Sequence, residues 1–318
     1  MMHERPRPAV VSRVAVTGAR GFVGVNLVEH LVDHGMQVLA IDNLSTGHQD
    51  VEPDPSVSFV QADFDSSGSV AAVEAFAPEA VVHLAAVHYL PYCRTHPEET
   101  LRVNATATSG FLEALSRLET LRRVVVASSA AVYGFGDEAF TERSELQPAD
   151  VYGESKVLAE RAVTEFAAGQ PDVSAVMLRF FNVFGPRETT PHLIPTLVGQ
   201  IARGEAIEVG NPWPRRDYVH VLDVASAVCA ALDAPLERPS IALNVATGRG
   251  TSVKEVIEIL MELSGNTDAW NQDPGRVRNL DGDLVGVGSL ARSVLGWEPD
   301  WTVERGLADL LEKELETA

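Results

Sequence analysis

The strongest structural signal in the sequence is the run Thr17-Gly18-Ala19-Arg20-Gly21-Phe22-Val23-Gly24, which joins an apolar strand pattern at 14–16 to an amphipathic helical pattern at 22–32. Glycine at the first position permits a tight turn, at the second lets the backbone approach a pyrophosphate, and at the third lets helix and sheet pack closely. The start of the helix adds amide donors and a positive dipole. We therefore predict that a dinucleotide contacts Gly18, Gly21, Phe22, Val23 and Gly24.

An acid at the end of the second strand strengthens this prediction. Asp42 lies 24 residues after Gly18, where a carboxylate can accept hydrogen bonds from an adenosine ribose. A carboxylate there repels a 2′-phosphate, so NAD is favoured over NADP, although Arg20 is a small counterweight. Asp63 ends the third strand and either bonds the adenine amino group or is a solvated loop acid. The neighbours Asn43 and Phe64 complete this side of the predicted cofactor site.

Apolar strands alternate with helices through the first half of the chain. Strands are predicted at 37–41, 57–60, 80–83, 123–127 and 173–179, and helices at 101–118 and 151–168. Continuous apolar strands between helices indicate a parallel sheet covered on both faces, here a Rossmann-type doubly wound sheet of the α/β class.

The alternating strand and helix pattern ends after Phe180, where five prolines between 186 and 214 break the chain into short pieces. A strand at 217–221, a helix at 222–232 and a strand at 241–245 follow, with helices at 251–263 and 303–315. We therefore predict an NAD-binding domain at 1–180, to which 217–246 returns. Residues 181–318 are predicted to form mainly a smaller C-terminal substrate-binding lobe.

Composition excludes several classes of partner. The 318 residues contain 45 acidic and 25 basic side chains, a formal net charge of −20, which disfavours nucleic acids and anionic membranes. Two cysteines are too few for a disulfide framework or a cysteine-based zinc site, and no metal is predicted. The opening residues lack a signal-peptide pattern, and no apolar run approaches bilayer length. A cytoplasmic location is therefore expected.

A phenol and an ammonium stand four residues apart at Tyr152 and Lys156, on one face of a predicted helix. A free phenol has a pKa of about 10, so a base at neutral pH needs help from the lysine and from a cationic nicotinamide ring. Lowering the pKa by ~3 units requires roughly 4 kcal/mol. Ser128 and Ser129 end the fifth strand, where a doubly wound sheet binds ligands. Alone, the serine pair is more typical of a strand-end cap, and the Tyr–Lys spacing often arises by chance.

Taken together, these motifs resemble the extended short-chain dehydrogenase/reductases of the NAD-dependent epimerase/dehydratase type, and most closely the nucleotide-sugar 4-epimerases acting on UDP-hexoses. The resemblance covers about 12–315. The matching segments are 17–24, His83-Leu84-Ala85-Ala86, Asn104, 128–134, 152–156, 179–186, 216–221 and Leu295-Gly296-Trp297.

The resemblance implies a role for each matching residue. Tyr152 is the base, Lys156 its modulator and ribose anchor, and Ser129 the partner of the substrate hydroxyl, with Ser128 beside it. The backbone of Leu84, Ala85 and Ala86 follows the nicotinamide half of NAD, with Asn104 nearby. Asn182 and Arg216 contact the diphosphate of a nucleotide-diphosphate sugar. A homodimer is implied, through helices 101–118 and 151–168.

Two alanines help to distinguish between the reactions that this family catalyses. Related dehydratases carry an acid pair directly after the catalytic hydroxyl, and related decarboxylases keep a glutamate there, whereas this chain has Ala130 and Ala131. Alanine cannot transfer protons, so the expected reaction is epimerisation through a 4-keto intermediate with retained NAD. Alternatives are a reductase, a dehydratase, another epimerisation position, or a dinucleotide-binding sensor or scaffold without turnover.

Two segments depart from the family pattern. The aromatic stretch 87–93 contains His88, which belongs either to an altered sugar pocket or to a packed loop, and Cys93, which is favoured as a small buried hydrophobe. The arginine that reaches the diphosphate from the segment 273–278 is either Arg276 or Arg278. Arg278 is favoured.

Overall fold

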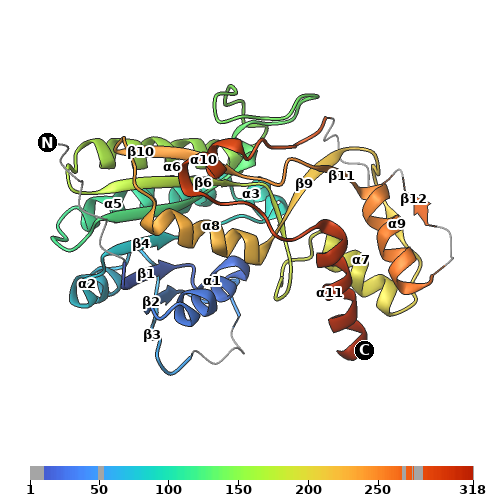
Figure 1. Cartoon of the computed structure of the whole chain (residues 1–318), viewed down its shortest axis with the longest axis horizontal. Helices are drawn as coiled ribbons and strands as arrows, with labels where there is room; N and C mark the ends of the chain where they lie inside the picture. The colour runs from blue at the N-terminus through green and yellow to red at the C-terminus, as the bar shows by residue number, and fades with distance from the viewer. Residues whose placement is uncertain (1–10, 49–53, 267–269, 274, 276–281, 318) are drawn as a thin grey trace, which may run out of the picture.

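The computed structural model describes residues 11–48, 54–266, 270–273, 275 and 282–317. A seven-stranded sheet forms its centre, and every neighbouring pair of strands in it is parallel (Figure 1). The strands, in spatial order, are β10 (Ser240–Val245), β6 (Ser174–Phe180), β5 (Arg123–Ser129), β4 (Ala80–His83), β1 (Arg13–Thr17), β2 (Gln37–Asp42) and β3 (Ser58–Gln61).

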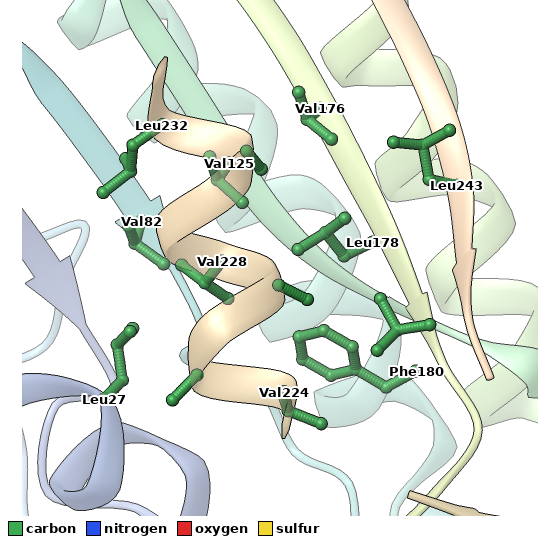
Figure 2. Packing of buried hydrophobic residues seen from close by; sticks show 14 of the residues in the cluster. Leu27, Val82, Val125, Val176, Leu178, Phe180, Val224, Val228, Leu232 and Leu243 are labelled. Carbon is green, nitrogen blue, oxygen red and sulfur yellow. The ribbon is translucent and has the colours of Figure 1, made fainter. Parts of the chain in front are cut away.

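Both faces of the sheet are buried, which explains why its strands read as continuous apolar runs. In β1, Val14 and Val16 belong to the hydrophobic cluster on one face, whereas Ala15 belongs to the cluster on the other. The first face is covered by α1 (Phe22–Asp33) and α8 (Val221–Asp233), whose apolar side chains lie against the strands in Figure 2. The second is covered by α2 (Ser67–Phe76), α5 (Thr108–Leu115) and α6 (Val151–Ala168).

A smaller lobe has a hydrophobic cluster of its own, which gathers α7 (Leu193–Ala202), α9 (Val253–Ser264) and α11 (Val303–Thr317). Its strands form a three-stranded sheet in the order β11 (Gly250–Ser252), β9 (Arg215–His220), β7 (Asn182–Phe184), and a pair of β12 (Asn271–Gln272) with β8 (Glu208–Val209). These elements lie together at one end of the main sheet (Figure 1).

Short elements complete the chain: α3 (Leu90–Thr95), α4 (Pro97–Leu101), the π-helix Arg102–Ala107, the 3₁₀ turn Ala130–Val132 and α10 (Ser289–Leu295). Within the described parts of the chain, no helix is both long and apolar enough to cross a membrane.

The predicted fold class is confirmed: the protein is a doubly wound α/β fold of the Rossmann type. Some predicted elements were wrong in detail. The region expected to be a single helix at 101–118 contains three segments: the end of α4, the π-helix, and α5, which ends at Leu115. The helix expected from Thr251 begins two residues later, because Thr251 and Ser252 belong to β11 and Ser252 caps α9.

Candidate active site

A cavity of about 890 Å³ opens at the carboxyl ends of the parallel strands and continues into the smaller lobe. Its wall includes residues from the ends of β2, β5 and β6, from the start of α6, and from β7 and β9 of the lobe. The predicted site residues on this wall are Gly18, Gly21, Phe22, Val23, Gly24, Asp42, Asn43, Asp63, Phe64, Leu84, Ala86, His88, Ser128, Ser129, Tyr152, Lys156, Asn182 and Arg216.

The three glycines of the turn after β1 have different surroundings. Gly18 has a φ of +69°, and a Cβ on it would lie 2.6 Å from the Ala85 nitrogen. A Cβ on Gly24 would lie 2.1 Å from the Gly18 oxygen, so α1 packs directly on the turn. Gly21 is different, because its only near neighbour would be the Gly18 oxygen at 3.4 Å while the residue lines the cavity. The turn thus leaves space at Gly21 for a close-fitting pyrophosphate.

The acids at the ends of β2 and β3 are oriented by hydrogen bonds. Asp42 is buried, and its carboxylate accepts from the backbone nitrogens of Arg20 at 2.9 Å and Leu44 at 2.8 Å. The Asn43 amide donates to Asp63 at 2.7 Å. The acid pair therefore forms a polar edge of the cavity suited to ribose and adenine donors.

The Arg20 backbone bonds to Asp42 of that edge, whereas its side chain has other partners. Its guanidinium donates to the His48 carbonyl at 3.1 Å and lies 5.7 Å from the centre of the Phe59 ring. Arg20 is not part of the cavity wall.

The segment after β4 follows the floor of the cavity. The Leu84 nitrogen donates to the Thr17 carbonyl at 3.0 Å, which fixes this segment against the glycine turn. Ala85 contacts Gly18 and lies behind the wall. Asn104 also lies behind the wall, where its amide group donates to the Val87 carbonyl and accepts from the Val87 nitrogen, both at 2.8 Å. Asn104 is thus placed to orient the loop that lines the cavity.

Tyr152 is brought beside Ser129 by the way α6 begins. The Asp150 carboxylate caps the helix by accepting from the Gly153 nitrogen at 3.0 Å. A Cβ on Gly153 would lie 2.4 Å from the Ala131 carbonyl oxygen, so only glycine lets this first turn pack against the 3₁₀ turn that follows Ser129. Tyr152 therefore supplies the phenol of the site, and Gly153 allows the first turn of α6 to pack closely against the turn after Ser129.

Burial moves the pKa values of Tyr152 and Lys156 apart. Burial raises the pKa of Tyr152 to about 12, against a hydrogen bond with the Ser129 hydroxyl that lowers it. Burial lowers the pKa of Lys156 to about 8, opposed by the negative charge of Glu160. The Lys156 ammonium donates to the Ala127 carbonyl at 2.8 Å and lies 5.8 Å from the centre of the Tyr152 ring. The protein groups alone do not produce the lowered phenol pKa expected from the sequence.

Ser128 belongs to a buried network that sequence reasoning missed. Its hydroxyl donates to the Glu160 carboxylate at 2.5 Å, and Glu160 is also paired with Arg179 of the adjacent strand. Arg179 in turn donates to the Tyr133 hydroxyl at 2.7 Å. One turn of helix separates Glu160 from Lys156, and this spacing was the only signal available in the sequence.

Two predicted substrate residues reach the cavity from the smaller lobe. Asn182 begins β7 and lines the cavity. Arg216 of β9 donates to the carbonyls of Arg215 at 2.8 Å and Gly282 at 3.0 Å, and its guanidinium lies 4.8 Å from the centre of the Phe135 ring. Arg276 and Arg278 lie outside the described residues.

The aromatic stretch 87–93 contributes Val87, His88 and Leu90 to the wall. The His88 ring has accessible surface but lies inside the cavity, where burial and then the charge of His192 lower its pKa to about 4. Cys93 is fully buried behind this segment, with its thiol 3.6 Å from the Val87 carbonyl, and burial raises its pKa. The loop Pro186–His192 adds Glu188 and His192, which sequence reasoning did not select.

The fold and this constellation define a dinucleotide-dependent enzyme, and the chain belongs to the NAD dependent epimerase/dehydratase family, whose model matches residues 14–246.

Two named relatives are 4-epimerases. The chain is 32% identical over 315 residues to a UDP-glucose 4-epimerase of Corynebacterium glutamicum, with 93% of this chain and 94% of the relative covered. Its structure is similar to that of the UDP-glucose 4-epimerase of Thermotoga maritima with UDP-glucose, at a TM-score of 0.88 and 26% identity over 96% of this chain and 99% of the other.

A third relative, MoeE5, has been solved with two different sugars. In the complex with UDP-glucuronic acid and NAD, the TM-score is 0.86 and the identity 34%, over 96% of this chain and 100% of that one. In the complex with UDP-glucose and NAD, the TM-score is 0.85 and the identity 33%, over 96% and 99%.

Proposed function

We propose that this protein is an NAD-dependent epimerase that inverts carbon 4 of a UDP-hexose. The observation that carries the proposal is the meeting of Ser129, Tyr152 and Lys156 on one cavity wall, next to the glycine turn, with alanine at 130 and 131. This set can move one hydroxyl proton but contains no second acid for eliminating water. The UDP-glucose 4-epimerase relatives support the same reaction.

Each catalytic side chain has one task. Ser129 holds the sugar 4-hydroxyl through its own hydroxyl, and the Tyr152 oxygen takes the proton as the carbon is oxidised and returns it after the sugar has presented its other face. Lys156, fixed on the Ala127 carbonyl, holds its ammonium beside the Tyr152 ring and opposes reprotonation of the phenolate. When bound, NAD supplies the hydride acceptor and a positive ring that favours the phenolate.

We assign the cofactor site to the glycine turn and the polar edge. Gly21 gives the pyrophosphate room, Asp42 accepts from the adenosine ribose, and Asp63 with Asn43 and Phe64 receives the adenine. Leu84, Ala85 and Ala86 form the backbone path of the nicotinamide half, while Asn104 acts through the Val87 loop rather than by contact.

The substrate diphosphate is assigned to Asn182 and Arg216, because a guanidinium can bind phosphate oxygens through two donors. Arg278 remains a candidate for the same group. In this division residues 1–180 with 217–246 bind NAD, and 181–318 mainly select the sugar nucleotide.

We further propose a cytoplasmic homodimer. Leu158 of α6 is 37% exposed, which leaves apolar surface on one of the two helices expected at the interface. Light scattering of the purified protein measures its mass, and a monomer at micromolar concentration contradicts this assembly.

The cofactor state tests the reaction. The purified protein, incubated with UDP-galactose and no added NAD, is expected to form UDP-glucose, followed by NMR of the anomeric proton. A dehydrogenase would consume added NAD in proportion to product, and a 4-keto-6-deoxy sugar would identify a dehydratase. Bound NAD without any turnover of a panel of UDP-, dTDP-, GDP- and CDP-sugars would leave the sensor interpretation.

A further inference from the structure

A buried acid, Glu188, pairs with a histidine, His192, whose side chain is 43% exposed. The Glu188 carboxylate is bonded to His192 Nδ1, four residues later, and the Glu188 side chain is only 3% exposed. His192 is the residue directly before α7. Both side chains line the cavity, and the His88 ring lies 6.1 Å from the His192 ring. A charged side chain this buried in a ligand cavity calls for a functional explanation.

The backbone before Glu188 is clamped so that the side chain points into the cavity. Arg187 has a φ of +69°, an uncommon conformation for a non-glycine residue. The Pro186 carbonyl accepts from Asn26 of α1 at 3.2 Å, and the Arg187 carbonyl is 2.8 Å from His48 Nε2. The Arg187 guanidinium pairs with Glu29 at 2.7 Å. These contacts fix the loop on the NAD-binding side of the cavity.

The pair lines the same cavity as Tyr152 and Lys156. The His88 ring of this wall lies 6.1 Å from the His192 ring, and the charge of Lys156 is among the causes that lower the pKa of His88. Among the described ion pairs, Glu188 is joined to His192 and to no lysine or arginine. The cations on the described part of the wall are Arg102, Lys156 and Arg216. Of these, Lys156 serves the base and Arg216 is assigned to the diphosphate.

Resting on the proposed function, we propose that Glu188, oriented by His192, selects a neutral hexose and excludes a uronate. A neutral hexose presents hydroxyl donors, which a carboxylate accepts as charge-assisted hydrogen bonds. A uronate instead places its own carboxylate beside Glu188, where no described lysine or arginine pairs with it, and like charges at short range in a poorly solvated site are strongly disfavoured. Discrimination then comes from a repulsive element as well as an attractive one.

The test compares UDP-glucose with UDP-glucuronic acid on three proteins. These are the unmodified chain, Glu188→Gln, and Glu205→Gln as a matched control, since Glu205 forms an exposed ion pair with Arg203 at the far end of α7. The unmodified chain is expected to favour UDP-glucose by at least ~100-fold in kcat/KM. Glu188→Gln is expected to reduce that preference at least ~10-fold, mainly through a lower KM for the uronate. Glu205→Gln is expected to keep it.

Binding separates this inference from the reaction itself. Calorimetric titration of the NAD-loaded Tyr152→Phe protein with each nucleotide sugar measures selection without turnover, so the preference for the neutral sugar is expected even if carbon 4 is not the reacting centre. Equal binding of both sugars, or a preference unchanged in Glu188→Gln, overturns the role of Glu188. Binding of neither sugar overturns both this inference and the proposed function.

Discussion

Arg179 and Glu160 form a two-point ion pair in the interior, with guanidinium-to-carboxylate distances of 2.8 and 2.6 Å. Their side chains are 5% and 9% exposed. The pair joins β6 to α6 directly behind the strand end that carries Ser128 and Ser129. Glu160 thus connects the serine segment to the helix that carries Tyr152 and Lys156, and it raises the pKa of Lys156 against the effect of burial.

Removing one member of this pair is expected to destabilise the fold strongly. In Glu160→Ala the guanidinium remains buried without its partner, and the free energy of unfolding should fall by about 3–5 kcal/mol. Urea denaturation followed by circular dichroism measures the change. The double variant Glu160→Leu with Arg179→Met is the control, because it removes both charges and should recover part of the loss. A single-variant loss below ~1 kcal/mol would contradict the interpretation.

The glycines of the turn predict separable effects on stability and on cofactor binding. Gly21→Ala has an ordinary backbone conformation and meets no close atom, so its melting temperature should stay near that of the unmodified chain. The added methyl occupies the space assigned to the pyrophosphate, and NAD affinity should fall at least ~10-fold. Fluorescence titration of the NAD-stripped protein measures it.

Gly24→Ala is the contrasting variant. Its methyl would lie 2.1 Å from the Gly18 oxygen, so α1 must move and stability should fall by at least ~2 kcal/mol. Gly21→Ala with undiminished NAD affinity would place the pyrophosphate elsewhere.

Much of the fold was predictable because the apolar strand patterns, the helical patterns and the glycine turn all indicate the same α/β arrangement. The alternation of apolar strands and helices predicts the parallel order that the sheet adopts. Missed elements have weak local signals: α2 contains only two buried residues, Ser69 and Val73, and α7 contains a proline at its third position. The π-helix Arg102–Ala107 also has no recognisable signal in the sequence.

The residues of the candidate site likewise fall into those that the sequence predicts and those that only the structure shows. Residues bound to a motif by chain spacing, such as Tyr152 and Lys156 or the three glycines, were predictable because helix and turn geometry fixes their relation. Glu188 and Glu160 were not, because their partners depend on how a loop and a helix pack in space. Asn104 shows the intermediate case, since its motif was recognised while its contact through a loop required the structure.

His83 predicts a loss of stability in mild acid. It is 4% exposed between the hydroxyls of Thr17 and Thr108, and burial, followed by the charge of Lys156, lowers its pKa to about 3. The unfolded chain binds a proton here below about pH 6.5, but the folded chain does so only near pH 3. Above about pH 6.5 the burial of neutral His83 therefore does not lower the free energy of unfolding. As the pH falls, the unfolded chain takes up the proton first, and the free energy of unfolding decreases by about 2 kcal/mol between pH 7 and 5.

Urea denaturation at several pH values measures this slope. His83→Gln should show a shallower decline than the unmodified chain over pH 7 to 5, although it starts less stable. Parallel curves for the unmodified chain and His83→Gln would rule out His83 as a source. His220, which is 1% exposed and whose pKa is lowered by burial to about 4, is expected to contribute to the remaining decline.

The division of labour between Tyr152 and Ser129 gives the last prediction. Tyr152→Phe keeps the ring that packs at the start of α6 but removes the proton acceptor, so kcat should fall by about 10²–10⁴-fold while the amount of co-purified NAD is unchanged. Ser129→Ala removes both the hydrogen bond to Tyr152 and the acceptor of the Ala131 nitrogen at 3.1 Å, and a smaller loss of kcat is expected. Steady-state NMR assays with NAD quantified after denaturation measure both. Turnover that survives Tyr152→Phe would require a different base.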